Sequence, residues 1–76
     1  MVKLVTVRWK DIIQHADWTP SEEVSCPEFV SVGWLAEESE EEIKIGGTLD
    51  DKGTPFGITA FPKGCVLEVL RLEDTS

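Results

Sequence analysis

Apolar and polar residues alternate along most of this chain with the period of two that is typical of β-strands. In the first run, residues 2–9, the side chains of Val5, Val7 and Trp9 share one face. Turn-forming and charged residues separate this run from four later ones. The pattern predicts five strands, at residues 2–9, 29–36, 42–45, 56–60 and 64–72.

The segment between the first two predicted strands has a different character. Asp11 can cap a helical turn, with Gln14 at the position that completes a capping box. A second start signal follows at Thr19 and Pro20, because proline is favoured at the first position of a helix. Pro27 closes the segment. The sequence therefore predicts a loop with one or two helical turns after the first strand.

Glycines and prolines in the strands indicate how the sheet bends. Gly33 lies inside the second predicted strand, which indicates a bulge or a bend, as at the corner of a barrel. Pro62 and Gly64 allow one strand to end and the next to begin almost at once. The last strand is apolar on both faces, so it is either central or covered by another subunit. These features predict a single all-β domain over residues 1–76, a strongly bent five-stranded barrel with a short helical insertion.

The charge of the chain restricts its partners. The formal net charge is −8, which disfavours nucleic-acid and anionic-membrane binding, since both require a basic face. Basic residues nevertheless gather at the start, where Lys3, Arg8 and Lys10 occur without an acid among the first ten residues. We therefore expect any anion site to draw on the first strand.

Compartment and assembly can also be predicted. The sequence shows no recognisable signal peptide and no run of transmembrane length, which predicts a cytoplasmic protein without membrane contact. Cys26 and Cys65 form no CxxC motif. Two reduced, buried thiols are favoured for them, and a single disulfide is the alternative. A chain of this size buries only about 60% of its unfolded surface, so we expect self-association to stabilise it.

Five glutamates lie within residues 37–42, between two predicted strands. This position predicts a solvated hairpin tip that keeps a sheet edge soluble. A metal-binding loop is disfavoured because the spacing does not match that of an EF-hand. Residues 49–55 are rich in aspartate, glycine and proline, and they predict a second turn.

Residues that could carry catalysis are few. His15 is the single histidine, and no nucleophile motif surrounds any serine or cysteine. His15, Cys26 and Cys65 also lack the spacing of a zinc site. The sequence therefore predicts a non-enzymatic protein without a metal or a cofactor.

Three tryptophans and no tyrosine are the unusual feature of the composition. Trp9 ends the first strand between Arg8 and Lys10, and Trp18 lies in the insertion beside Asp17. An aromatic face beside a basic side chain suits a stacked base that carries a phosphate. The alternative is that Trp9 and Trp18 clamp the insertion onto the barrel.

Three stretches together resemble a known group of proteins. They read VTVRWKDI (residues 5–12), SVGWLAEE (31–38) and FPKGCVLEVLRL (61–72). They are similar to short proteins of tailed phages and prophages with the pattern V-x-W-x-D, S-V-G-[WFY]-L and I-P-[KR]-G-C. The chain departs from that pattern at Phe61, where the group has an aliphatic residue. The second half also resembles Sm- and SH3-like small barrels, which implies such a barrel and a homo-oligomer paired through its last strands.

The phage resemblance implies a cytoplasmic protein of an infected bacterium. One role for such proteins is to sequester the nucleotide messengers of host immune systems such as Thoeris and CBASS. The expected ligand is a cyclic dinucleotide or an ADP-ribose derivative, held in a pocket between subunits. The candidate ligand-binding residues are Trp9 and Trp18 to stack on the base, Arg8 and Lys10 for phosphates, Asp11 for a ribose hydroxyl or base amine, and Lys63 and Arg71 from a neighbouring subunit.

The alternative function is a protein-interaction module. The chain would then be a phage adaptor, or an inhibitor that presents its acidic face to a host protein as a nucleic-acid mimic. The working surface would be the glutamate hairpin together with Asp50 and Asp51.

Overall fold

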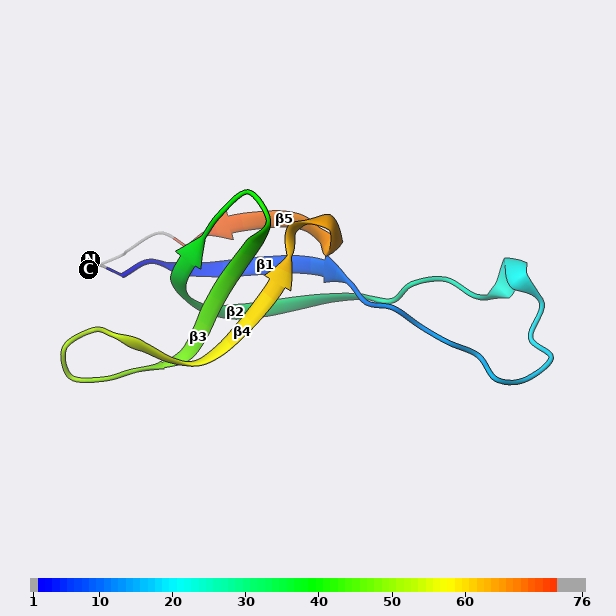
Figure 1. Ribbon diagram of the computed structural model, residues 1–76, viewed down its shortest axis with the longest axis horizontal. Helices are drawn as coiled ribbons and strands as arrows, with labels where there is room; N and C mark the ends of the chain where they lie inside the picture. Colours follow the sequence, from blue (N-terminus) through cyan, green and yellow to red (C-terminus); the bar gives the residue numbers. More distant parts are fainter. Residues whose placement is uncertain (1, 73–76) are drawn as a thin grey trace.

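The computed structural model describes residues 2–72, which form one five-stranded antiparallel sheet (Figure 1). The strands confirm the prediction of a small all-β protein. Their bounds are β1 Leu4–Lys10, β2 Glu28–Glu38, β3 Glu42–Leu49, β4 Pro55–Pro62 and β5 Val66–Arg71. Two 3-10 turns, η1 at Ser21–Glu23 and η2 at Lys63–Cys65, complete the secondary structure.

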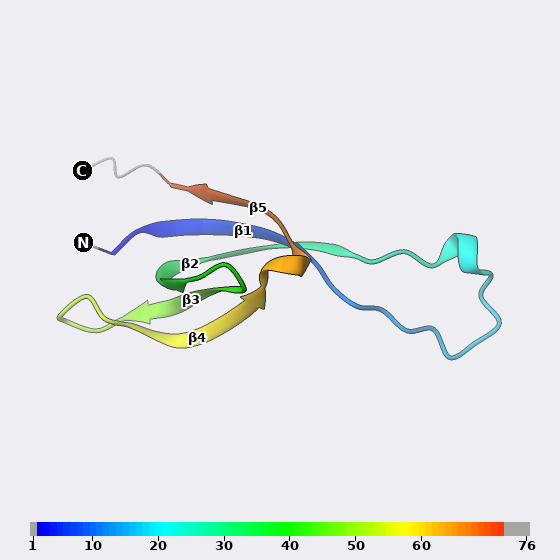
Figure 2. The ribbon, with the colours of Figure 1, turned by 45° about the horizontal axis from the view of Figure 1, so that its top comes forward.

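The strands follow the order β4-β3-β2-β1-β5, so β4 and β5 are the two edges of an open sheet. The long strand β2 joins its two halves, because Leu4 of β1 and Gly46 of β3 both pair with Trp34. A register shift between Leu35 and Glu37 bends β2 there. The β3–β4 hairpin consequently runs across β1 and β5 (Figures 1 and 2). The expected closed barrel is not formed within the single chain.

The core lies between these two halves of the bent sheet. Val5 and Val7 of β1 meet Ile43 and Ile45 of β3 and Phe61 of β4, and all five side chains are buried. They occupy alternate positions of their strands, as the period-two pattern of the sequence requires. The core is small for 76 residues, and several large apolar side chains remain exposed elsewhere: Ile12, Trp18, Val30, Val32, Phe56, Ile58 and Leu70.

Gly33 lies where β2 crosses β3, and the sequence correctly placed a bend at this strand. A Cβ atom at Gly33 would lie 2.9 Å from the carbonyl oxygen of Gly46 and 3.1 Å from the side chain of Ile45. Gly46 is equally confined, since its Cβ would lie 2.8 Å from the carbonyl oxygen of Phe56. The absence of side chains at these two positions lets the strands approach closely enough to bury the core.

The segment after β1 corrects the predicted helical insertion. No α-helix forms among residues 2–72. Residues 11–27, which we name the arm, extend away from the sheet as two extended stretches and carry only η1 (Figure 1). The radius of gyration is 15.4 Å and the longest dimension 51 Å, whereas a compact chain of this length has a radius of about 11 Å. The arm accounts for the elongated shape.

Strand β5 corrects a second expectation. The corner before it is as tight as predicted, since η2 alone joins β4 to β5. However, β5 is an edge strand paired only with β1, so the interpretation of its two apolar faces as those of a central strand is wrong. Leu67 and Leu70 are 42% and 53% exposed. The alternative, that another subunit covers its outer face, stays a prediction.

Two smaller expectations concern the cysteines and the membrane. Cys26 and Cys65 are both free thiols; Cys26 is exposed and Cys65 half-buried, so the prediction that both are buried is wrong. The part of the chain from residue 2 to residue 72 contains no helix long and apolar enough to cross a bilayer.

Candidate functional site

A recess opens at the end of the sheet where the arm begins. Its volume is about 300 Å³, at the lower end of the range for small-ligand sites. The chain segments that line it come from the end of β1, from β2, from β4 and from η2. The lining residues are Trp9, Lys10, Asp11, Ile12, Ser31, Thr59, Ala60, Phe61, Pro62 and Cys65.

Trp9 forms a wall of the recess and is held firmly in place. Its indole Nε1–H donates a hydrogen bond to the Ser31 Oγ at 3.0 Å. Its ring packs against Phe29, with the ring centroids 5.1 Å apart, and against Phe61, at 5.3 Å. Such tilted aromatic contacts are favourable beyond the area they bury. Trp9 therefore joins the recess to the core. Trp18 is 100% exposed, so the alternative that both tryptophans clamp the insertion onto the sheet is wrong for Trp18.

Lys10 and Asp11 supply the charged groups of the recess, and both are exposed. The backbone N–H of Asp11 donates to the Pro27 carbonyl at 3.0 Å, which fixes the root of the arm. The Asp11 Oδ1 accepts from the N–H of Ile12 at 2.8 Å, which leaves its second carboxylate oxygen for other donors. The Asp11 carboxylate can thus meet a hydroxyl or an amine of a ligand. Lys10 also lines the recess, but it alternates with Trp9 along β1 as Arg8 does, so the strand does not direct its ammonium group to the face on which Trp9 lies.

Arg8 and Lys63, both predicted ligand residues, are engaged elsewhere in the single chain. The Arg8 Nη1 lies 2.8 Å from Glu28 and its Nε lies 3.7 Å from Glu68. Arg8 also precedes Trp9 in the strand, so its side chain points to the opposite face of the sheet. The Lys63 Nζ lies 2.7 Å from the carboxylate of Glu38, beside the acidic hairpin.

Trp18 and Arg71 lie outside the recess of their own chain. Trp18 is 100% exposed, near the tip of the arm. Asp17 beside it accepts hydrogen bonds from the hydroxyl and the N–H of Thr19, and these bonds lower the pKa of the Asp17 carboxyl. Arg71 ends β5 and pairs with Val5, near the start of β1, whereas the recess lies at the end of β1. The structure therefore brings together Trp9, Lys10 and Asp11 and separates the other four predicted residues from them.

Sequence reasoning missed most of the lining of the recess. Phe61 and its neighbours in β4 reach Trp9 because β4 folds across β1, a long-range relation that alternation cannot indicate. One signal was available, however. The sequence showed a phenylalanine at position 61, and its ring is one of the two that pack on Trp9.

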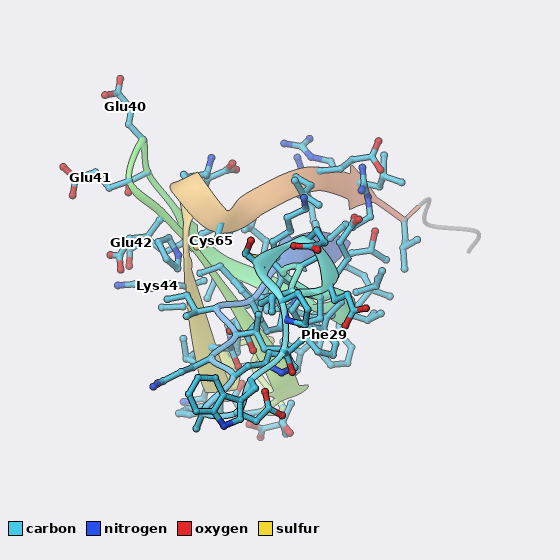
Figure 3. The ribbon with its side chains drawn as sticks, turned by 90° about the vertical axis from the view of Figure 1, so that its right-hand side faces the viewer. Phe29, Glu40, Glu41, Glu42, Lys44 and Cys65 are labelled. Carbon is cyan, nitrogen blue, oxygen red and sulfur yellow. The ribbon has the colours of Figure 1, made fainter. Side chains whose placement is uncertain are left out.

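The acidic hairpin between β2 and β3 has the predicted form. The Ser39 Oγ accepts from the N–H groups of Glu41 and Glu42, both at 3.2 Å, and closes the turn. Glu40 and Glu41 extend away from the body, as Figure 3 shows. Glu37 and Glu38 instead pair with Lys44 and Lys63 across the strands. The tip thus presents unneutralised negative charge to solvent.

Metal-ligand clusters and similarity to known proteins are the two remaining observations that bear on this site. Residues 2–72 contain no group of three His, Cys, Asp or Glu side chains that could hold a metal ion. Comparisons with protein-family models, with curated proteins and with solved structures found no match to this chain.

Proposed function

We propose that this chain is a non-enzymatic protein that binds and sequesters a nucleotide-derived immune messenger in the recess at Trp9. The observation that carries the proposal is the meeting of an aromatic wall, a lysine and an aspartate at one recess. The indole offers a stacking surface, and Lys10 a charge for a phosphate. The walls themselves are mainly apolar, as is typical of sites for small planar ligands.

The wider setting of the proposal comes from the resemblance to phage proteins. On that resemblance we propose a protein that acts in the cytoplasm of an infected bacterium, with a cyclic dinucleotide or an ADP-ribose derivative as the messenger. An SH3- or Sm-like barrel is part of the same proposal. The strand order β4-β3-β2-β1-β5 and the single 3-10 turn between β4 and β5 support it.

Self-association is supported by the apolar surface of the single chain. Val30 and Val32 of β2 are 62% and 57% exposed, and Leu70 of β5 is 53% exposed on the other side of β1. Val32 and Leu70 both pair with Thr6, so the three apolar side chains lie on one face of the sheet. Exposed apolar side chains that gather on one face favour an interaction site in a soluble protein. A homo-oligomer would cover it and would give a small domain the buried area that it lacks alone.

The test of the proposal is native mass spectrometry with a panel of cyclic dinucleotides, cyclic ADP-ribose isomers and ADP-ribose conjugates. We expect wild-type protein to gain ligand mass. Replacement of Lys10 and Asp11 by alanine should weaken binding by about 10- to 100-fold, the loss of one charged and one polar contact. Both residues are exposed, so we expect the variant to fold.

Lys52→Ala is the matched control, because Lys52 is an exposed lysine in the β3–β4 turn, away from the recess. It should bind the ligand as the wild type does. If the wild type gains no ligand mass across the panel, the recess is not a site for these nucleotides. The same holds if Lys52→Ala weakens ligand binding as much as the variant with Lys10→Ala and Asp11→Ala. Trp9→Ala is a poorer probe, because Trp9 also packs against Phe29 and Phe61.

A protein-interaction module is the second candidate, favoured by the protruding hairpin. Glu40 and Glu41 extend from the body, and no ion pair within residues 2–72 neutralises either of them. Unpaired charge on a projecting turn suits long-range steering toward a basic partner. The surface would then act as an acidic mimic.

Charge reversal separates the two candidates. Glu40→Lys with Glu41→Lys changes the charge of the tip by four units, since each substitution removes one negative and adds one positive charge. We expect the variant to bind the nucleotide panel as wild type does. The interaction module predicts a different result in a capture experiment with host protein. The charge-reversal variant should then lose a host protein that the wild type captures, and the variant with Lys10→Ala and Asp11→Ala should still capture it.

A further inference from the structure

The arm exposes apolar side chains that its own chain leaves uncovered. Trp18 is 100% exposed and Ile12 85% exposed. One backbone hydrogen bond, from Asp11 to Pro27, joins the two stretches at the root, and the other hydrogen bonds of the arm are local, from Ile12 to Asp11 and within residues 17–24. A two-stranded segment without a ladder is at best marginally stable in water. A surface outside the chain that covers these side chains would stabilise the arm.

The recess supplies a surface of the right chemistry. It lies at the root of the arm, next to Ile12, with Trp9, Phe61 and Pro62 among its walls. Its volume of about 300 Å³ accommodates an indole ring. Trp18 cannot reach it within the chain, because the arm carries its tip away from the sheet (Figures 1 and 2).

The positions of Trp18 and the recess along the arm suit a contact between two copies of this chain. The exposed tryptophan is near the tip of the arm and the apolar recess is at its root. If two arms lie side by side in opposite directions, each tip reaches the root of the other arm at the same time. Such a contact is isologous and closes on itself, as two-fold dimers do.

The two tryptophans supply part of the area that a dimer requires. Burial of one tryptophan removes about 150–250 Å² from water, so two reciprocal contacts remove about 300–500 Å² from the tryptophans alone. The walls of the two recesses and both copies of Ile12 and Ile13, which are 85% and 40% exposed, add to this area. The total approaches the value of about 1,000 Å² that a specific interface should exceed.

We propose that Trp18 of one copy docks at the Trp9 recess of a second copy, and that the two copies exchange this contact reciprocally. The contact forms without ligand. If the proposed nucleotide binding holds, a planar base bound at the recess would lie between Trp9 and the Trp18 of the other copy. The two tryptophans that the single chain separates thus belong to one site.

Crosslinking tests the geometry. Cys65 lines the recess, and Ala16 is an exposed residue near Trp18. In a Cys26→Ser, Ala16→Cys variant without ligand, a short bismaleimide should give covalent dimers in which residue 16 is joined to residue 65 of the other copy. Peptide mass spectrometry identifies the link. The same variant with Trp18→Ala should lose most of it.

Sedimentation of the ligand-free protein provides an independent readout. Trp18→Ala should weaken dimerisation by about 30-fold or more, the effect of removing a tryptophan anchor, while circular dichroism stays unchanged because Trp18 makes no contact in its own chain. Gln14→Ala, an exposed arm residue, should dimerise as wild type does. A wild type that is monomeric at high micromolar concentration, an unaltered Trp18→Ala dimer, or tip-to-tip links between two residues 16 would overturn the proposal. None of these results tests nucleotide binding by the recess of a single chain. That binding is tested separately by the variant with Lys10→Ala and Asp11→Ala.

Discussion

Replacement of Phe61 by alanine is expected to lower the free energy of unfolding by about 3–5 kcal/mol, the cost of removing a buried phenylalanine ring. Phe61 is 5% exposed and belongs to the core with Ile43, its partner across β3 and β4. Its ring also supports Trp9 at 5.3 Å. Because a domain of this size has a total stability of about 4–11 kcal/mol, the variant should be largely unfolded in mild denaturant.

Phe56 provides the matched control for this prediction. It is in the same strand, is the same residue type and is 53% exposed. We expect Phe56→Ala to lower the free energy of unfolding by less than about 1 kcal/mol, the usual range for exposed positions. Urea denaturation of the three proteins, followed by tryptophan fluorescence, provides the comparison. Equal losses in the two variants would mean that the sheet does not bend over Phe61.

Replacement of Gly33 by alanine is expected to lower the free energy of unfolding by about 1–3 kcal/mol, the cost of overpacking a closed site. The added methyl group would lie 2.9 Å from the carbonyl oxygen of Gly46 and 3.1 Å from Ile45. The first neighbour is backbone, so relief requires β2 and β3 to move apart. That movement opens the core between Val5 and Ile45.

Gly47 provides a control within β3, because nothing lies within 4 Å of a Cβ added there. Gly47→Ala should leave stability unchanged or raise it slightly, since alanine has less conformational freedom to lose on folding than glycine. Thermal unfolding of the two variants measures the difference. A Gly33→Ala protein as stable as Gly47→Ala would contradict the close crossing of the two strands.

These two predictions also bear on the recess. Trp9 is positioned by Ser31 and Phe29 of β2 and by Phe61 of β4. Any change that separates β2 from β3, or that removes Phe61, should therefore alter the environment of Trp9. The stability of the bent sheet and the shape of the candidate site depend on the same contacts.

Local pattern determined much of the fold. The five strands, the acidic hairpin and the tight corner before the last strand follow from alternation and turn residues, which act between near neighbours. Alternation also separates Arg8 from Trp9 within the first strand, because adjacent residues in a strand point to opposite faces. The sequence alone therefore indicated that Arg8 and Trp9 lie on different faces, whereas the pairing of β1 with β2 and β5 decided that Arg8 meets Glu28 and Glu68.

Tertiary structure decided the features that depend on residues far apart in the sequence. The bend of β2 between Leu35 and Glu37 lets β4 fold across β1, so that Phe61 meets Trp9 at the recess. The strand order leaves β5 at an edge, although both of its faces are apolar. The arm forms only one 3-10 turn, because a short helix is marginally stable in water without tertiary packing, and most of residues 11–27 are exposed. The sequence by itself determined where strands and turns form, and long-range packing alone decided which side chains meet.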